Sequence, residues 1–498
     1  MNRKLIRRIL LAIPAIILQI AWFVILARWL APYATLVSVV VEIFAFIFVM
    51  YLMVAITEGT YKILWLMVIL ALPVTGGILY LFFGDKRSGK PLRKKIENSS
   101  RELDIKDTYH EIKTKNKRLD ETLNMLQRET AYPALPLEKA KYYSIGEDMW
   151  KDMLVDLKKA KKSIYLEYFI IENGRMWDSM VEILEKKVLN GVDVRLMYDD
   201  IGSFATYGYD NVRELREKGI KCFSFNPLTR LKGTLNYRDH RKMLIIDEEI
   251  AYSGGVNLAD EYINEFEKHG HWKDIGFRIT GQPVDSYLRM FIEFYNAFTV
   301  EDKLKYVPKE AAGPKTNHGT IISYYDSPVG KNARSYNFYI ELINQAKDYV
   351  YFYTPYLMLG DDMMNSLIRA AKRGVDIRII MPGIPDKKLV YRISRSYYRP
   401  LMEAGVRIFE YTPGFVHAKA LITDDIVCTI GTVNLDYRSL FLHFENNSVF
   451  YKSKILNDLK ADYLSTQEKC TERTVDNMKY SFVKFMIDGV LRIFAPLC

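Results

Sequence analysis

Cysteine and histidine are both scarce in this chain of 498 residues, which has four of the first and seven of the second. No two cysteines form a C-x-x-C pair, which indicates neither a zinc site nor a disulfide framework and fits a reducing compartment. Carboxylates and histidines do not cluster at metal-ligand spacing either, so we predict a protein without a metal ion or other cofactor. The cysteines are Cys222, Cys428, Cys470 and Cys498.

An excess of acidic charge is also missing. Lysine and arginine number 70 against 60 aspartates and glutamates, which gives a net charge of +10 and a pI of about 9.0. A basic chain suits an anionic partner, either nucleic acid or an anionic membrane surface. With 49% hydrophobic and 26% charged residues, the composition supports a large core and argues against global disorder. The length suggests two or more domains.

Three long apolar runs stand near the N-terminus, at Ile9–Ala27, Tyr33–Thr57 and Ile63–Phe83. About 20 helical residues span the hydrocarbon core of a bilayer, so each run is long enough. Three consecutive runs argue against a single buried core helix. No small-x-small cleavage site follows Leu26, which argues against a signal peptide. We predict that residues 1–84 form a membrane region with two to three helices, which favours lipid over nucleic acid as the anionic partner.

Basic residues flank this region on both sides, before the first run and again in residues 86–95. Both flanks therefore indicate the cytoplasmic side, which needs an even number of crossings, whereas three runs give an odd number. The cluster after Phe83 is the denser of the two. We predict a multi-pass protein of the cell membrane with its catalytic domains in the cytoplasm, and leave the number of crossings open.

Two further segments are predicted from their composition. Residues 85–135 are polar and charged, which is typical of a linker with a solvated helix. The tail Tyr480–Cys498 is apolar, with Lys484 and Arg492 spaced through it. We predict that this tail packs into the core, with interfacial contact to a membrane as the alternative.

The rest of the chain repeats itself. Strand-like segments alternate with helical patterns twice, and Gly191-Val-Asp-Val-Arg195 in the first copy matches Gly374-Val-Asp-Ile-Arg378 in the second. This alternation predicts two pseudo-symmetric α/β domains, each with a mostly parallel sheet, at residues 136–306 and 320–498. The boundary falls in the polar stretch Val307–Gly319.

One short motif also occurs twice, once in each copy. His240, Lys242 and Asp247 follow the pattern H-x-K-x4-D, and His417, Lys419 and Asp424 repeat it 177 residues later. Each motif leads through a second apolar run to an asparagine, Asn257 or Asn434. Alternate side chains of a strand share a face, so the histidine and lysine of each motif should point the same way.

These residue types suit chemistry at a phosphate. An imidazole can attack phosphorus or move a proton near neutral pH, and an adjacent lysine can neutralise a phosphate oxygen without a metal. A lone H-x-K is typical of a solvated surface strand. Two copies with the same aspartate and asparagine spacing indicate one site built from both halves.

The duplicated motifs resemble the phospholipase D superfamily, and in particular the bacterial cardiolipin synthases. The similarity covers about residue 33 to the end, and the first apolar run is a departure from the two membrane segments usual in that family. Further segments that carry the resemblance are Trp65–Pro73 with Gly77–Gly84, Glu167–Ile171, Gly254–Leu258, Thr354–Tyr356 and Gly431–Ser439 with Phe444-Glu445.

The resemblance implies a cardiolipin synthase made of two phospholipase D-like domains. One histidine, which we predict to be His240, attacks phosphatidylglycerol and forms a phosphatidyl-histidine. His417 protonates the departing glycerol and then activates a second phosphatidylglycerol, which gives cardiolipin. Lys242, Lys419, Asn257 and Asn434 hold the phosphate oxygens. Asp247 and Asp424 orient or balance the site, with a role in a hairpin turn as the alternative. Glu445 orients a histidine, and in the first half Asp274 is the acid nearest in role.

Two other activities remain open at this stage. A membrane-bound phospholipase D would give the phosphatidyl group to water, and the motifs do not distinguish it because only the acceptor differs. A membrane-anchored nuclease would suit the charge, but the apolar runs favour a lipid. A scaffold with a dead site is disfavoured because both motifs are complete. The sequence gives neither the oligomeric state nor the acyl preference.

Overall fold

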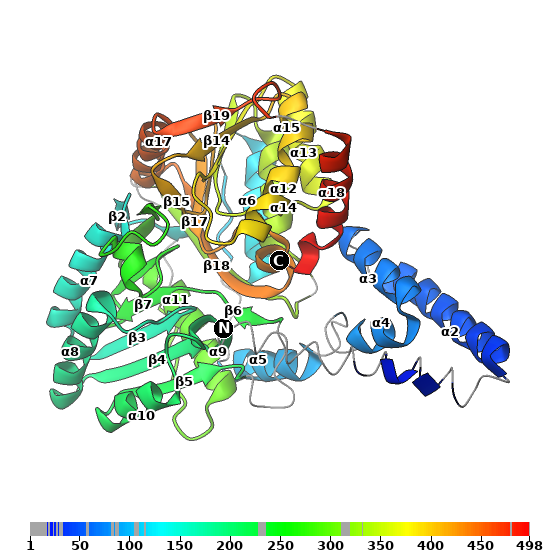
Figure 1. Cartoon of the computed structure of the whole chain (residues 1–498). Helices are drawn as coiled ribbons and strands as arrows, with labels where there is room; N and C mark the ends of the chain where they lie inside the picture. The colour runs from blue at the N-terminus through cyan, green and yellow to red at the C-terminus, as the bar shows by residue number, and fades with distance from the viewer. Residues whose placement is uncertain are drawn as a thin grey trace.

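The computed structural model shows two β-sheets side by side, flanked by helices, with a pair of long helices extending from the body (Figure 1). The residues that it describes are 17, 20–22, 24–25, 28, 33–55, 59–80, 84, 89–103, 109–113, 116–227, 236–309, 319–330, 332–478 and 481–497.

The first half of the chain forms a seven-stranded sheet in the order β2-β10-β8-β7-β3-β4-β5. Three strands, β3, β4 and β5, run parallel, and the remaining neighbours pair antiparallel. Helices α7 and α8 lie side by side in this half. The strands are β2 (Lys139–Tyr143), β3 (Ser163–Tyr168), β4 (Asp193–Asp199), β5 (Lys221–Phe225), β7 (Met243–Ile246), β8 (Ile250–Gly254) and β10 (Gly276–Thr280). The helices are α7 (Gly146–Lys159), α8 (Arg175–Leu189), α9 (Asp200–Ser203), α10 (Tyr209–Glu217), η4 (Asp260–Ile263) and α11 (Val284–Phe298).

The second half repeats this order as β11-β18-β17-β16-β12-β13-β14 and adds strands at both edges. Its main strands are β11 (Thr320–Asp326), β12 (Tyr349–Tyr353), β13 (Asp376–Pro382), β14 (Arg407–Tyr411), β16 (Ala420–Thr423), β17 (Val427–Gly431) and β18 (His443–Tyr451). The added edge strands are β1 (Leu135–Pro136) and β19 (Cys470–Arg473). The helices are α12 (Arg334–Gln345), α13 (Asp361–Lys372), α14 (Lys388–Ser396), α15 (Tyr398–Glu403), α16 (Tyr437–Phe441), α17 (Lys454–Gln467), α18 (Phe482–Ile493) and η5 (Ala495–Leu497).

The two pseudo-symmetric α/β domains are confirmed, but the prediction of mostly parallel sheets is wrong. Each H-x-K motif leads into an antiparallel hairpin, β7–β8 in the first half and β16–β17 in the second. The hairpin then pairs with β10 or β18, again antiparallel. Each sheet therefore has a parallel part built by helical crossovers and an antiparallel part built by hairpins.

The halves are joined by two short pairings in which a strand before one histidine meets the acidic segment of the other half. Strand β6 (Arg238–Asp239) runs parallel to the start of β18. Strand β9 (His271–Lys273) pairs in the same way with β15 (Gly414–Val416). Each half thus extends one segment into the other, and the site lies where they cross.

The segment predicted to be a charged linker, residues 85–135, packs closely against both halves. Helix α5 (Lys90–Glu102) contacts α11, where the Ser99 hydroxyl donates to the Glu293 carbonyl at 2.7 Å. Helix α6 (Lys117–Thr130) contacts α12 through a face that buries Leu119, Leu123 and Leu126. The mixed charges on the outer faces of these helices concealed their apolar sides in the sequence.

Near the N-terminus, α2 (Ala34–Ala55) has 22 residues, which is about 33 Å at 1.5 Å per residue. Its segment Thr35–Ala55 is, among the described residues, the one helix long and apolar enough to cross a membrane. The third apolar run breaks before Pro73 into α3 (Gly59–Ala71) and α4 (Pro73–Leu79), because proline fits the first turn of a helix and not its interior. The run Ile9–Ala27 lies largely outside the described residues. The structure thus supports one span and does not support the predicted multi-pass arrangement.

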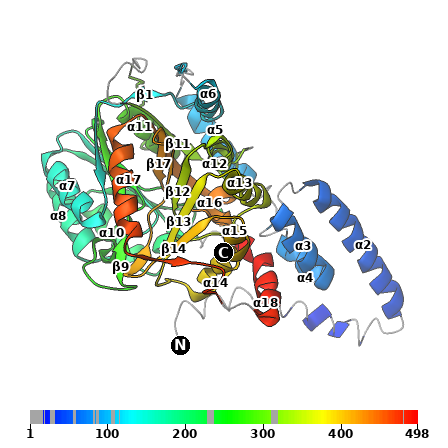
Figure 2. The ribbon, with the colours of Figure 1, turned by 90° about the horizontal axis from the view of Figure 1, so that it is seen from above.

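The prediction that the C-terminal tail packs into the core is wrong for helix α18 and holds for η5 at its end. Helix α18 lies on the side of the body that faces α3, as Figures 1 and 2 show. Its apolar residues are largely exposed, and Asp488 is the buried member of the helix. Helix α18 is therefore not part of the core, whereas Ala495 of η5 is fully buried and belongs to it.

Candidate active site

The two H-x-K motifs meet at the junction of the halves through a reciprocal exchange of main-chain hydrogen bonds. The His240 N–H donates to the Phe444 carbonyl of the second half at 2.9 Å. The His417 N–H donates to the Lys273 carbonyl of the first half at 2.7 Å. Each histidine is thereby fixed beside the segment that carries an acid of the opposite half.

The acids complete this crossing. Nδ1 of His240 lies 2.9 Å from both carboxylate oxygens of Glu445, 205 residues away in the chain. Nδ1 of His417 lies 2.6 Å from Oδ2 of Asp274, 143 residues away. All four side chains are buried. Glu445 and Asp274, named from the sequence without their partners, are therefore placed on the histidines of the opposite halves.

This arrangement determines which nitrogen of each ring is reactive. The carboxylate accepts a hydrogen bond from the N–H group at Nδ1. Nε2 of the neutral imidazole therefore keeps its lone pair for a substrate. Burial and the nearby Lys242 ammonium lower the pKa of His240 well below its usual range. Burial and Lys419 also lower the pKa of His417, to about 4, although Asp274 opposes the shift.

The acids are not equivalent. Burial alone would raise the pKa of Asp274, but His417 and Lys419 outweigh it and hold the pKa below its usual value. Burial raises the pKa of Glu445 well above its usual value, against the opposing charge of Lys242. Asp274 is therefore the more fully ionised partner, and His417 is the histidine better supported to carry a proton.

The two lysines fold back onto their own motifs. Nζ of Lys242 donates to the His240 carbonyl at 2.6 Å, and Nζ of Lys419 donates to the His417 carbonyl. Burial lowers the pKa of Lys242 to about 7 and that of Lys419 to about 8, while Glu445 and Asp274 act in the opposite direction on both. The site thus holds two lysines whose ammonium groups lose their protons near pH 7 and pH 8.

We expect kcat/KM for a phosphodiester to fall about tenfold per pH unit above about pH 7, where Lys242 loses its proton, and about a hundredfold per unit above about pH 8, where Lys419 follows, because kcat/KM follows the free enzyme. The pKa of each lysine is lowered, so its ammonium is present below that pKa and lost as the pH rises through it. A pH profile of the wild type and of Lys419→Arg tests this, since a guanidinium stays charged and should remove the steeper fall above about pH 8 while the fall caused by Lys242 remains. A wild-type profile that is flat from pH 7 to 9.5 would contradict it.

The amides of the two predicted asparagines, which follow the hairpins β7–β8 and β16–β17, are partly engaged in hydrogen bonds. Oδ1 of Asn257 accepts from the Ile170 N–H at 3.1 Å, and its Nδ2 donates to the Tyr262 hydroxyl at 2.6 Å. The Tyr262 ring stands edge-on to His417 at 5.2 Å. Nδ2 of Asn434 donates to Asp436 at 2.9 Å. Each Nδ2 has a second hydrogen, which could serve a phosphate oxygen.

The two motif aspartates lie at the other end of the hairpins. Asp247 and Asp424 have φ of 54° and 51°, a left-handed conformation that aspartate tolerates in a turn. The Asp424 carboxylate accepts from three N–H groups at 2.8–3.0 Å, those of Lys347, Asp348 and Tyr349. Asp247 binds the equivalent N–H groups of residues 161–163. The strand between lysine and aspartate separates them by roughly 16 Å at about 3.3 Å per residue, so the structure favours the hairpin-turn alternative over a role at the reacting atoms.

Replacing Asp424 with alanine should destabilise the protein and spare the chemistry. The variant loses three hydrogen bonds and places alanine in a left-handed turn, so we expect about 2 kcal/mol lower stability and an activity within threefold per folded molecule. Thermal unfolding in detergent measures the first, and turnover normalised to folded protein the second. Asp424→Asn, which tolerates the turn, should lose less stability. A large loss of activity in folded Asp424→Ala would instead place this carboxylate in the reaction.

Several residues of this site were missed in the sequence, and they differ between the halves. The Thr432 hydroxyl donates to Glu445, whereas Gly255 occupies its place in the first half. A Cβ on Gly255 would collide with the Asp274 carboxylate, so the shorter acid requires the glycine. A second pair of equivalent positions, 272 and 443, lies two residues before Asp274 and Glu445. Comparison of the two turns before the asparagines could have found the first pair, and comparison of the two acidic segments the second.

His443 and Trp272 occupy that second pair of positions. The His443 ring lies 5.7 Å from His240, and the Trp272 ring lies 5.5 Å from His417. Nε2 of His443 accepts a hydrogen bond from Nε of Arg438 at 3.1 Å, which leaves the ring proton on Nδ1. Nδ1 lies 3.8 Å from a Glu445 oxygen. His240 thus lies beside the polar ring of His443, whereas His417 lies beside the largely apolar ring of Trp272.

His240, His443 and Glu445 offer three potential metal-ligand atoms within 4.8 Å of one another. This geometry differs from the sequence prediction that no such cluster exists. The chemistry of the donors fits a metal poorly, however, because Arg438 occupies Nε2 of His443 and His240 is already paired with Glu445. A metal on Nδ1 of His443 would require that ring to lose a proton while it still accepts from a guanidinium.

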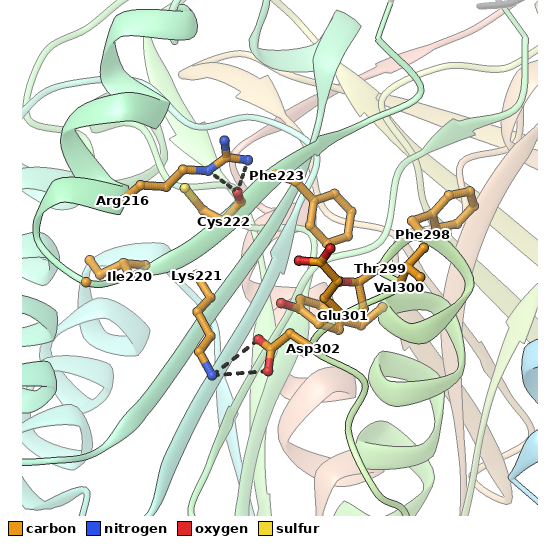
Figure 3. A pocket seen from close by; sticks show the side chains of 12 residues that line it. Arg216, Ile220, Lys221, Cys222, Phe223, Phe298, Thr299, Val300, Glu301 and Asp302 are labelled. Carbon is orange, nitrogen blue, oxygen red and sulfur yellow. Dashed lines mark hydrogen bonds and ion pairs between the residues drawn. The ribbon is translucent and has the colours of Figure 1, made fainter.

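Figure 3 shows a surface hollow elsewhere in the first half, between β5 and the residues that follow α11. Lys221 and Asp302 form an ion pair at its edge, with Nζ and Oδ2 3.2 Å apart. None of the predicted site residues lines this hollow.

Comparison with known proteins agrees with the geometry. The family described as "Cardiolipin synthase, PLD-like domain" matches residues 153–269 and 339–465, once in each half. The family described as "Phospholipase D-nuclease N-terminal" matches residues 43–84. Among solved structures, the phosphatidylserine synthase of Haemophilus influenzae superposes with a TM-score of 0.60 at 15% identity, covering 77% of this chain and 98% of that one.

Relatives match over nearly the whole chain. A cardiolipin synthase of Alkalihalophilus pseudofirmus is 31% identical over 456 residues, covering 88% of this chain and 89% of its own. One of Listeria welshimeri is 31% identical, covering 87% and 92%. An uncharacterized protein of Streptococcus mutans is 39% identical, covering 87% and 96%.

Two H-x-K half-sites on paired sheets of this order define a phospholipase D-like protein, as the sequence predicted. The chain belongs to the cardiolipin synthase family, and it is an enzyme of the phosphatidyltransferase type.

Proposed function

We propose that this enzyme makes cardiolipin by moving a phosphatidyl group from one phosphatidylglycerol to another, with release of glycerol. The observation that carries the proposal is the pair of histidines at one site, each bound at Nδ1 by the acid of the opposite half. Two imidazoles with free Nε2 atoms allow one displacement at phosphorus to be divided into two.

In the first step, Nε2 of His240 attacks phosphorus and the bond to glycerol breaks. The leaving oxygen takes a proton from Nε2 of His417. An anionic phosphodiester beside His417 raises the pKa of the imidazolium above that of the empty site, which supplies this proton near neutral pH. In the second step, the neutral His417 takes the proton of an acceptor hydroxyl while that oxygen attacks phosphorus and releases His240.

The surrounding cations and amides stabilise the charge at phosphorus. Lys242 and Lys419 balance the phosphate oxygens from the two halves, and the free amide hydrogens of Asn257 and Asn434 complete the cradle. The lower pKa of His240 suits the nucleophile, which must be unprotonated, and the ionised Asp274 suits His417 as acid and base.

The site is held close to the membrane segment. The Tyr61 ring of α3 stacks on Tyr437 of α16 at 6.0 Å, and α16 follows the loop that carries Asn434. A lipid substrate is favoured over a nucleic acid for this reason. We further propose that both catalytic halves lie on the cytoplasmic side, where the basic flank at residues 86–95 would place them.

The product formed from phosphatidylglycerol tests the proposal. Purified enzyme incubated with phosphatidylglycerol labelled in its head group and acyl chains should give cardiolipin and free glycerol in equal amounts. Phosphatidic acid as the main product would show that water is the acceptor and the enzyme is a phospholipase D. His417→Ala protein should give neither product.

Turnover should persist in excess chelator, because lysines and imidazoles rather than a metal are expected to balance the phosphate. We expect activity in 5–10 mM EDTA, about a hundredfold or more above typical trace-metal levels, to remain within twofold of the untreated enzyme. Loss of activity in EDTA and its recovery with one divalent ion would assign the cluster at His443 to a metal.

A further inference from the structure

Helix α18 turns its apolar side away from the protein. Phe482 is 77% exposed, Phe485 57% and Met486 52%. Val483 and Val490 on the same helix are also exposed. Soluble proteins rarely expose so many large apolar side chains together, so a contiguous patch of this kind indicates a partner surface.

The inner side of the helix is polar and firmly held. Asp488 is 4% exposed, and Nε of Arg492 donates to the Ser396 hydroxyl of α14 at 3.2 Å. The Arg492 guanidinium also lies over the Tyr397 ring at 4.8 Å. The spacing 484, 488 and 492 places these polar residues on one face. The outward direction of the apolar face is therefore fixed by specific contacts.

The exposed face continues an apolar surface that belongs to the membrane region. Helix α18 contacts α3, and η5 after it contacts α3 as well. Ile63, Met67 and Leu70 of α3 are exposed. Both views show α18 on the side of the body from which α2 and α3 extend (Figures 1 and 2).

Positive charge borders this surface. Lys387, Lys388 and Arg392, at the start of α14, are exposed beside the apolar Leu389. Helix α14 packs directly against α18. Apolar side chains bordered by lysine and arginine are the pattern of a helix that lies in the interface of an anionic bilayer.

We propose that α18, together with the start of α14, is a docking surface for an anionic lipid bilayer, beside the span formed by α2. The occupant is the lipid surface itself rather than a second protein, because the apolar face is continuous with a membrane-embedding helix and bordered by cations. The α2 span anchors the enzyme, and this second contact sets the orientation of the catalytic halves.

The docking surface is coupled to the catalytic site. Helix α16 contacts η5, and NH1 of Arg438 in α16 donates to the Leu497 carbonyl at 3.5 Å. The same guanidinium donates to His443, which lies beside Glu445. Contact of α18 with lipid thus places the histidines close to the head groups on which they act.

Photocrosslinking tests the occupant independently of any reaction. Full-length protein with benzoylphenylalanine in place of Phe485 is reconstituted in vesicles of phosphatidylcholine and phosphatidylglycerol and irradiated. The control carries the same group in place of Leu189, an 81% exposed residue of α8. We expect lipid adducts at position 485 at least tenfold above those at 189. Adducts to a second copy of the chain at 485, or lipid yields equal at the two positions, would overturn the proposal.

Acidic substitutions on the apolar face of α18 test whether docking on the bilayer supports turnover of lipid in vesicles. The double variant Phe485→Asp with Met486→Asp should lower turnover of vesicle phosphatidylglycerol about tenfold or more. Turnover of a short-chain, monomeric phosphatidylglycerol should stay within twofold, and Leu189→Asp should change neither. This arm relies on the proposed function. Loss of both activities in the double variant would indicate misfolding or a role at the site, and unchanged vesicle turnover would refute docking.

Discussion

Replacing His417 with alanine should leave the enzyme as a covalent phosphatidyl-His240 when it is given a phosphatidyl ester with a good leaving group. Such a group departs without a proton, so the attack by His240 needs no acid. The second step then fails, because no base activates the acceptor hydroxyl. We expect the adduct to build up to about one per molecule, and cardiolipin synthesis to fall about 10⁴-fold or more.

Replacing His240 with alanine should give the opposite result. The nucleophile is missing, so no adduct should form with any leaving group, and net synthesis should again fall about 10⁴-fold or more. Mass spectrometry of both variants after incubation with an activated phosphatidyl ester locates the modified residue. His110→Ala, which removes a histidine in the segment before α6, is the matched control and should keep most of its activity.

Two results would revise the mechanism. An adduct on His417 in the His240→Ala variant would reverse the two roles. If neither variant forms an adduct while the wild type turns over the activated ester, a single direct displacement by the acceptor would be the better account.

Replacing Asp274 with asparagine should disable a histidine that lies in the other half of the chain. The carboxamide cannot stabilise an imidazolium at His417 and can favour the wrong tautomer, as the aspartate-to-asparagine change does in a serine protease triad, where kcat falls about 10⁴-fold. We expect a loss in kcat of about 10³-fold or more. With the activated ester, Asp274→Asn should still form the adduct on His240, as His417→Ala does.

Glu445→Gln should instead resemble His240→Ala. Without the carboxylate, Nδ1 of His240 loses its fixed proton acceptor, and formation of the adduct should slow about 100-fold or more. Asp156→Asn is the matched control, because Asp156 is a buried carboxylate that pairs with Arg278 and the Tyr252 hydroxyl outside the site. Adduct formation that is lost in Asp274→Asn and kept in Glu445→Gln would show that the acids serve the opposite histidines from those the structure pairs them with.

The sequence predicted the reactive side chains better than their partners. His240, Lys242, His417 and Lys419 could be found because the same short spacing occurs in both halves of the sequence, although the structure places them just before β7 and β16 and not within a strand. The link from Glu445 to His240 crosses 205 residues. It depends on how two domains dock, and a single sequence carries no local signal for that.

The errors in the fold have a similar physical origin. The alternation of strands and helices was real for β3–β5 and β12–β14, but the antiparallel hairpins that contain the motifs follow the same residue preferences. Helix α18 was assigned to the core because its sequence is apolar, and an apolar sequence does not show whether residues such as Phe485 face inward or outward. Only the direction of α18 distinguishes the two.

The crossed acids make the chain behave as an internal heterodimer in which neither subunit owns a complete catalytic pair. If the halves part, Glu445 leaves His240 and Asp274 leaves His417 in the same movement. Activity therefore requires both histidine–acid pairs at the same time, and separation of the halves leaves neither histidine with its acid. Under the proposed mechanism, an early opening would also separate His417 from Asp274, and the base that would activate a water molecule against phosphatidyl-His240 would lose its support.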